Sequence, residues 1–248
     1  MLLQQATQQF KLTKYHTSRL IKAHHSLFSH QNRLSDLQSL ADWSGASQAS
    51  ILYLLLQATA NQSATQSPIT QPPSILPHSS PFQHDGTEHA LEAEADGLTL
   101  AGDRELSSID FDHAASHLAV ALAIQQILEQ IPINAKHKIN LIPTEIGAKF
   151  GLTDEALFRF GPQAEGLRES VANLVGIGKA ELKTSRSCLN SRVPSDRLPV
   201  FLGGVMAESV FDLLSSDHVL FDVFDHKLHK RNWKLPFTLA FKNFNKQF

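Results

Sequence analysis

The sequence of 248 residues contains a single cysteine, Cys188. One thiol excludes an intramolecular disulfide and, taken alone, a cysteine-rich metal cluster, as is typical of a compartment that keeps thiols reduced. An excess of either charge is also missing, because 22 Lys and Arg oppose 24 Asp and Glu and the formal net charge is −2. This balance provides no basic surface for nucleic acid, so no nucleic-acid partner is expected.

Long apolar runs are missing too, since none approaches the roughly 20 residues that a membrane-spanning helix requires. The run ILYLLL at residues 51–56 is short, and the apolar segment at residues 199–214 is interrupted by Glu208 and Asp212. Any association with a membrane is therefore expected to be peripheral.

Apolar residues do not alternate at period two for long enough to form a sheet, and they recur instead at helical spacing. The sequence therefore predicts an all-α fold. Its centre is the segment at residues 112–131, DHAASHLAVALAIQQILEQI, which is apolar around most of a helical circumference. Such a helix belongs in a protein core, and Pro132 is expected to end it.

One strip of this helix carries small or polar side chains. At about 100° per residue, the strip contains Asp112, Ser116, Ala119, Ala123, Gln126 and Gln130. A strip of this kind fits either a closely packed neighbouring helix or the wall of an internal cavity, and both interpretations stay open. Gln126 and Gln130, with Asn134 one turn further on, are neutral amides that hold divalent cations poorly. We therefore predict neither a metal nor a cofactor on this strip.

His113 and His117 lie four residues apart in the same helix, next to Asp112, and have the spacing of metal ligands. The sequence places no third histidine beside them. We therefore favour a packed or capping pair over a metal site, and we predict no catalytic residue.

The chain divides into three predicted parts. Residues 1–60 form N-terminal helices, and residues 109–248 form the remainder of the same helical domain. Between them, residues 61–108 are rich in Pro, Ser, Gln and Thr and then in acidic side chains. This composition cannot bury enough apolar surface to offset its ordering entropy, so a disordered insertion is predicted.

The first 35 residues contain basic but no acidic side chains, a composition typical of a mitochondrial transit peptide. A domain helix is favoured instead, because five positions recur at helical spacing and the pattern runs into the next element without a linker. These recurring positions are Phe10, Thr17, Leu20, His24 and Leu27.

Local signals predict where further helices begin and end. Ser35 with Gln38 indicates a capping box, Pro143 a helix start, Gly151 a helix end and Thr153 an N-cap. A long helix follows, with Leu167, Val171, Leu174, Val175 and Leu182 facing inward. Residues 193–214, 217–231 and 233–246 are predicted to supply the last helices.

The order of these pieces resembles the squalene/phytoene synthase family, and within it the non-enzymatic mitochondrial branch of complex I assembly factors. The resemblance covers most of the chain outside the insertion. Its most specific parts are DHAASHL at residues 112–118, the IP at 131–132, and the pair LIPTEIG and FGLTDEALF at 141–158, which is similar to the enzymes' YLP…GV…DL segment. The resemblance implies a helical bundle of the isoprenoid-synthase type, with the chain starting late enough that N-terminal helices are expected to be missing.

Enzymes of this family join two prenyl diphosphates with Mg²⁺ held by two aspartate-rich DxxxD motifs. By resemblance, the second motif would fall near Gln130 and Asn134, with Glu129 at the position of an arginine, and nothing matches the first motif. The resemblance therefore implies a protein without catalysis or cofactors. It would assist early biogenesis of a membrane-arm subunit of respiratory complex I, and its partners would be complex I assembly intermediates. It would be bound peripherally to the matrix side of the mitochondrial inner membrane.

Two alternatives stay open: an active or residual prenyl-diphosphate transferase, and a lipid-binding module without chemistry. Phe237, Phe241 and Phe244 recur near the C-terminus. They are interpreted either as a contact for a hydrophobic client or lipid tail or as core residues, and the core interpretation is favoured.

Overall fold

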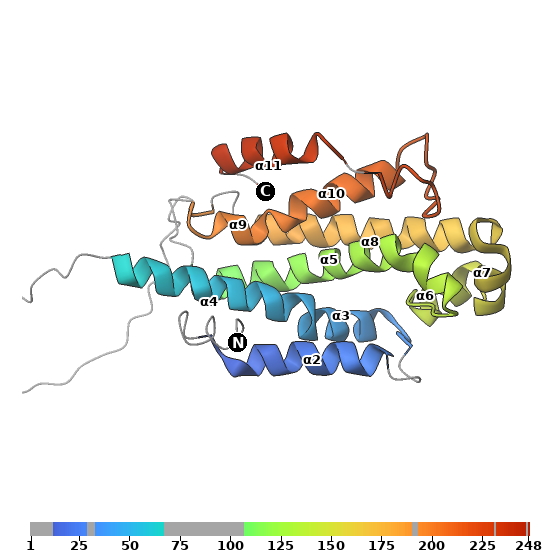
Figure 1. Cartoon of the computed structure of the whole chain (residues 1–248), viewed down its shortest axis with the longest axis horizontal. Helices are drawn as coiled ribbons and strands as arrows, with labels where there is room; N and C mark the ends of the chain where they lie inside the picture. The colour runs from blue at the N-terminus through green and yellow to red at the C-terminus, as the bar shows by residue number, and fades with distance from the viewer. Residues whose placement is uncertain (1–11, 29–32, 67–106, 190–192, 231, 247) are drawn as a thin grey trace, which may run out of the picture.

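The computed structural model describes residues 12–28, 33–66, 107–189, 193–230, 232–246 and 248, and every regular element among them is helical (Figure 1). The elements are α2 (Lys14–Phe28), α3 (Leu37–Ala46), α4 (Gln48–Gln66), α5 (Ser108–Lys136), α6 (Thr144–Phe150), α7 (Asp154–Phe160), the 3₁₀ turn η1 (Gly161–Gln163), α8 (Leu167–Cys188), α9 (Leu198–Phe201), α10 (Gly203–Leu214) and α11 (Leu235–Phe244). The prediction of an all-α fold is confirmed.

Helix α5 is the centre of the bundle. Ser107 and Asp110 form a reciprocal capping box at its start, which satisfies backbone N–H groups that would otherwise have no partner. Its most extensive packing is against α8, and it also packs against α3, α4 and α10. By length and composition α5 could cross a membrane. Because Leu118, Ile124 and Leu128 are fully buried inside the bundle, we describe it as a core helix.

The other helices form layers on either side of the α5–α8 pair (Figure 1). Helices α2, α3 and α4 cover one side, α9 and α10 cover the other, and α11 is the outermost element beyond α10. The α8–α10 contact depends on Gly178, where an added Cβ would lie 2.5 Å from the fully buried ring of Phe211. This glycine therefore permits α10 to pack closely against α8.

The predicted end of the central helix is wrong. Helix α5 continues through Pro132 to Lys136, with His137 as its C-cap. Proline removes one backbone hydrogen bond and crowds the preceding turn, but the helix buries Ile131 and Ala135 on either side of it. The free energy gained by burying these two side chains outweighs the unfavourable effect of proline inside the helix.

Two other predicted boundaries also differ. Helix α3 is capped by Asp36, whose carboxylate accepts a hydrogen bond from the Ser39 backbone N–H at 2.7 Å. The capping box is therefore one residue further on than the predicted pair Ser35 and Gln38. Helix α4 reaches Gln66, so residues 61–66, which were predicted to be disordered, are helical. The rest of the predicted insertion, up to residue 106, lies outside the described residues.

The segment at residues 217–230 forms consecutive turns rather than the predicted helix. The carboxylates of Asp222 and Asp225 each accept a hydrogen bond from the backbone N–H two residues further on. Such local bonds compete with helix formation. Leu220 and Phe221 have φ values of 48° and 60°, which also break a right-handed helix.

Most other local predictions are confirmed. Thr153 accepts a hydrogen bond from Ala156 N at the start of α7, Pro143 precedes α6, and Gly151 ends it with φ 77°. The five inward residues of α8, Leu167, Val171, Leu174, Val175 and Leu182, are all buried. Helix α2 packs against α3 and α4 as a domain helix, while Phe10 lies outside the described residues.

Candidate functional site

The strip of small and polar residues on α5 faces neighbouring helices over part of its length. Ala119 and Ala123 are fully buried. Gln126 accepts a hydrogen bond from the side chain of Gln48, at the start of α4, over 2.5 Å. Gln130 is half-buried, and the Ser116 hydroxyl donates to the main-chain oxygen of His113 at 2.7 Å. Among the amides of the strip, Gln126 therefore hydrogen-bonds within the protein.

A pocket of about 340 Å³ opens at the N-terminal end of α5 instead. It is lined by residues from α2, α4, α5 and the segment before α9, namely His16, Tyr53, Leu56, Gln57, Ala60, Ser108, Phe111, Asp112 and Arg197. Its volume lies at the low end of the range for small-molecule sites. Of the predicted site residues it includes Asp112. It includes none of Ser116, Ala119, Ala123, Gln126 and Gln130, whose cavity-lining role stays a prediction.

Burial is the main cause of the pKa shifts of two side chains in this pocket, Asp112 and His16. Burial raises the pKa of Asp112, and the nearby charges of His16 and Arg197 oppose that shift. Burial lowers the pKa of His16, and Arg197 also stacks on the ring of Phe111 at 4.4 Å. Among the described residues that line the pocket, Asp112 is the sole carboxylate. A magnesium diphosphate site uses several carboxylates, so this pocket suits a small ligand with limited charge.

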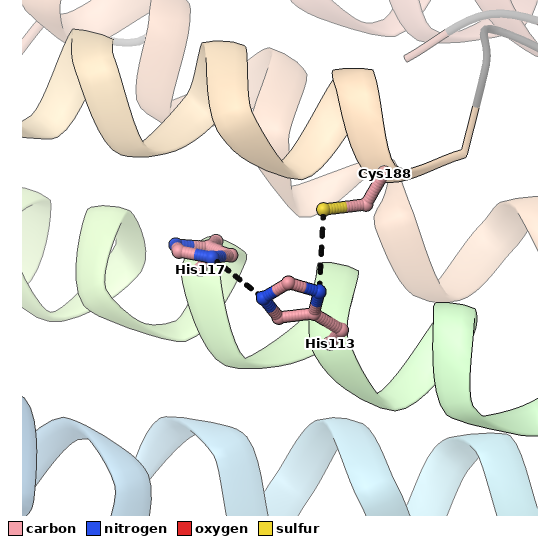
Figure 2. A group of neighbouring side chains, drawn as sticks. All are labelled: His113, His117 and Cys188. Carbon is pink, nitrogen blue, oxygen red and sulfur yellow. Dashed lines mark hydrogen bonds between the residues drawn. The ribbon is translucent and has the colours of Figure 1, made fainter.

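His113 and His117 meet a cysteine from another helix. His113 Nε2 lies 3.1 Å from His117 Nε2, and His113 Nδ1 lies 3.7 Å from the Sγ atom of Cys188, the last residue of α8. Figure 2 shows the ring of His113 between the ring of His117 and this thiol. Burial, followed by the charge of Asp110, raises the pKa of Cys188. A thiol of this kind is a weaker nucleophile than a thiolate.

A carboxylate orients one of these histidines. Glu181 on α8 lies 2.6 Å from His117 Nδ1, and the two side chains are each about a quarter exposed, 27% and 28%. A carboxylate partner favours a proton on Nδ1. The Nε2 atom of His117 is then left with its lone pair facing His113.

Helix α11 presents aromatic side chains to the surface. Phe237, Phe241 and Phe244 are 70%, 66% and 83% exposed, and Trp233 just before the helix is 69% exposed. The three phenylalanines follow a spacing of four and three residues, so they share one helical face. The favoured interpretation that they fill the core is wrong.

The family assignment follows from a match over most of the chain. The family model described as squalene/phytoene synthase matches residues 1–234. The chain belongs to the squalene/phytoene synthase family. No solved structure matches it.

The chain is also similar to curated proteins named "NADH dehydrogenase (ubiquinone) complex I, assembly factor 6". The protein of Rattus norvegicus is 29% identical over 143 residues, 58% of this chain and 42% of the relative. The protein of Homo sapiens is 28% identical over 151 residues, 61% of this chain and 43% of the relative. The Drosophila melanogaster homolog is 28% identical over 117 residues, 47% and 34% of the two chains. The chain thus spans about two fifths of the length of the rat and human relatives.

Within this member of the family, sequence reasoning missed Glu181 and Cys188 as neighbours of the histidine pair. Glu181 is 64 positions from His117, and Cys188 is 75 positions from His113. Both come from the helix that packs most extensively on α5. The helical periodicity of α8 could have placed Glu181 on the side of the helix that faces α5. The proximity of Cys188 to His113, by contrast, depends on how the two helices pack against each other.

Proposed function

We propose that this chain is part of a non-catalytic assembly factor for mitochondrial respiratory complex I. It acts early, in the biogenesis of a membrane-arm subunit, and binds complex I assembly intermediates on the matrix side of the inner membrane. The observation that carries the proposal is the similarity to assembly factor 6 proteins, at 28–29% identity over about three fifths of the chain for the rat and human proteins.

The residues on α5 support the absence of prenyl transfer. Gln130 and Asn134 are half-buried amides, where the synthase reaction would need carboxylates to hold Mg²⁺. The acidic neighbour Glu129 has a pKa raised by burial, which disfavours the charged form that a cation requires. The helical scaffold is retained without this chemistry.

Peripheral membrane binding is proposed to occur through α11. Residues 226–248 contain six basic side chains and no Asp or Glu, although the whole chain has a net charge of −2. The structure describes five of the six, and all five are exposed or half-buried, namely Lys227, Lys230, Lys234, Lys242 and Lys246. Exposed aromatic residues flanked by lysines are typical of a helix that lies in the interface of an anionic bilayer. We therefore assign an anionic lipid surface as the occupant of this face.

Loss of the gene product, followed by native gels of the respiratory complexes, tests the assembly role. The expected result is a selective loss of mature complex I with accumulation of an early intermediate, restored by the wild-type protein. An equal decrease of all respiratory complexes, or no decrease at all, would contradict the proposal.

Vesicle co-sedimentation tests the role of α11. The triple variant Phe237→Ser, Phe241→Ser, Phe244→Ser should lose most binding to vesicles that contain about one fifth anionic lipid. The matched control is Phe160→Ser, which removes a 56% exposed phenylalanine from α7 and should bind normally. Equal binding by the triple variant would refute the lipid assignment. Retained lipid binding with lost capture of complex I intermediates would instead make this face a client contact.

A second candidate is prenyl-diphosphate transfer, which the family match favours, or lipid binding within the fold, which the pocket near Asp112 favours. Incubation of the purified protein with farnesyl diphosphate and Mg²⁺ is expected to release no pyrophosphate. Sustained release would establish catalysis. Native mass spectrometry of the purified protein would detect a retained isoprenoid or acyl chain if the fold binds one.

A further inference from the structure

We propose that His113, His117 and Cys188 bind one thiophilic transition-metal ion, with Zn²⁺ as the best fit, and that Glu181 positions His117 for this role. The four residues come from the two helices that make the most extensive contact of the bundle, α5 and α8. The proposal is independent of complex I and of any reaction of the synthase family.

The side-chain types match the chemistry of such ions. Imidazole nitrogen and thiolate sulfur are preferred ligands of Zn²⁺, while Mg²⁺ and Ca²⁺ prefer oxygen. Two histidines four residues apart on a helix project from the same face. Here the third ligand comes from Cys188 at the end of a different helix, so the site depends on the fold rather than on one segment.

The distances fit a single ion. One ligand atom from each of His113, His117 and Cys188 can be chosen so that all three lie within 4.8 Å of one another. Two Zn–N bonds of about 2.0–2.1 Å at a tetrahedral angle place the nitrogens roughly 3.3 Å apart. The observed separation of the two Nε2 atoms is 3.1 Å. The two nitrogens therefore already have the separation that one ion requires, and the site is completed when the Cys188 sulfur reorients to within about 2.3 Å of the same ion.

Glu181 prepares His117 to act as a ligand. Its carboxylate lies 2.6 Å from His117 Nδ1, so it accepts the proton of that nitrogen and leaves Nε2 free to coordinate. A carboxylate hydrogen-bonded to a ligating histidine is a common feature of zinc sites, and it fixes both the tautomer and the orientation of the ring.

The site has three protein ligands and lies near the surface. His113 is exposed, and His117 and Cys188 are half-buried, so an ion can enter from solvent and retain a water molecule as a fourth ligand. An ion held here would connect α5 to the end of α8. We therefore expect metal binding to raise the melting temperature, because it stabilises the folded state only.

Titration of the untagged, reduced protein with Zn²⁺ against a chromophoric chelator tests the proposal. One equivalent should bind, and Mg²⁺ should not compete. Co²⁺ in place of Zn²⁺ should produce a thiolate-to-cobalt charge-transfer absorption with the intensity of a tetrahedral site. Binding weaker than the chelator can detect, together with no cobalt absorption, would overturn the proposal.

Variants identify the ligands. Cys188→Ser should abolish the cobalt charge-transfer band, and Cys188→Ser and His117→Ala should each weaken Zn²⁺ binding by about 100-fold or more. Glu181→Gln should weaken it by about 10-fold to 100-fold while retaining the band, as expected for a positioning residue. The control is His25→Ala, which removes an exposed histidine from α2 and should bind like the wild type.

The melting temperature in the presence of a chelator shows whether each variant is folded. A variant that melts like the metal-free wild type but gains no stability from Zn²⁺ supports the assignment. Unchanged Zn²⁺ affinity in Cys188→Ser, or an equal loss in His25→Ala, would show that the ion binds elsewhere and would refute the site.

Discussion

Helices α5 and α11 are both rich in apolar residues but have opposite surroundings. Large side chains such as Leu118, Ile127 and Leu128 on α5 are fully buried, whereas no residue of α11 is buried. The two helices also differ in how their apolar residues are distributed, because α5 is apolar around most of its circumference and α11 concentrates its phenylalanines on one face flanked by lysines. Helix α5 leaves Ile109 and Ile133 exposed among its large apolar side chains, near its two ends. Helix α11 therefore offers the larger apolar face that a partner could still bury.

The residues that stabilise this protein differ from those that we propose it uses for binding. Burial of α5 against α8 and its neighbours supplies the core. Within the bundle, Gln126 of α5 accepts a hydrogen bond from Gln48. The candidate binding features, namely the aromatic face of α11, the pocket at Asp112 and the histidine cluster, all lie at helix ends or on the surface. Substitutions in the two regions should therefore have different consequences.

The largest expected effect is on stability and comes from the core. Phe211→Ala should lower the free energy of unfolding by about 3–5 kcal/mol, because it leaves a cavity beside Gly178 in a fully buried position. Phe241→Ala on α11 should change it by less than about 0.5 kcal/mol, because the side chain is 66% exposed. Urea unfolding followed by circular dichroism measures both. Equal losses would mean that α11 contributes to the core after all and would remove the distinction between the two helices.

A smaller effect, of opposite sign, is expected from Pro132 in α5. Pro132→Ala restores a backbone N–H inside a helix, where proline is about 3 kcal/mol less favourable than alanine. Part of the gain is offset because the unfolded chain regains freedom, so we expect about 2 kcal/mol of stabilisation in urea unfolding. The control is Ile133→Ala at an exposed neighbouring position, which should be near neutral. Destabilisation by Pro132→Ala would mean that the packing of α5 requires the distortion caused by proline.

Much of the fold could be predicted from local signals. The cap at Thr153 and the inward face of α8 depend on interactions within a few residues, and periodicity alone identifies them. The helix end at Pro132 was wrong because burial of the residues around it outweighs backbone preference. The helix expected at residues 217–231 was wrong because aspartate side chains bond the local backbone instead, and apolar spacing does not report such bonds.

The candidate sites were predictable only in part. Asp112, His113 and His117 were singled out because they lie within one turn or two of the same helix. Their partners Arg197, Glu181 and Cys188 come from segments 64 to 85 positions away along the chain, and the docking of helices decides which of them meet. The exposure of α11 also could not be read from its composition, since apolar residues at helical spacing fit a core face and a binding face equally well.

The smallest expected effect is on the pH dependence of stability, and it comes from an ion pair between α8 and α10. Glu208 on α10 accepts hydrogen bonds from the Arg186 guanidinium on α8 at 2.7 and 2.8 Å, and this interaction, ahead of the nearby lysines, lowers the pKa of Glu208 from its ordinary value of 4.5. A carboxyl with a lowered pKa in the folded state stabilises the protein above the unfolded value, and that contribution is lost as the pH falls through the folded value. Both side chains are about a third exposed, 27% and 35%, so solvent screening limits the contribution to about 1 kcal/mol.

Glu208→Gln should therefore destabilise the protein by that amount at pH 7, and the difference from the wild type should shrink below pH 4.5. The measurement is urea unfolding at a series of pH values, with Asp212→Asn on the exposed side of α10 as the control, because its carboxylate pairs with Lys179 at 63% exposure. A difference for Glu208→Gln that stays constant down to pH 3 would contradict the assignment of this pair as a charge interaction and would attribute the loss to packing of α10 against α8.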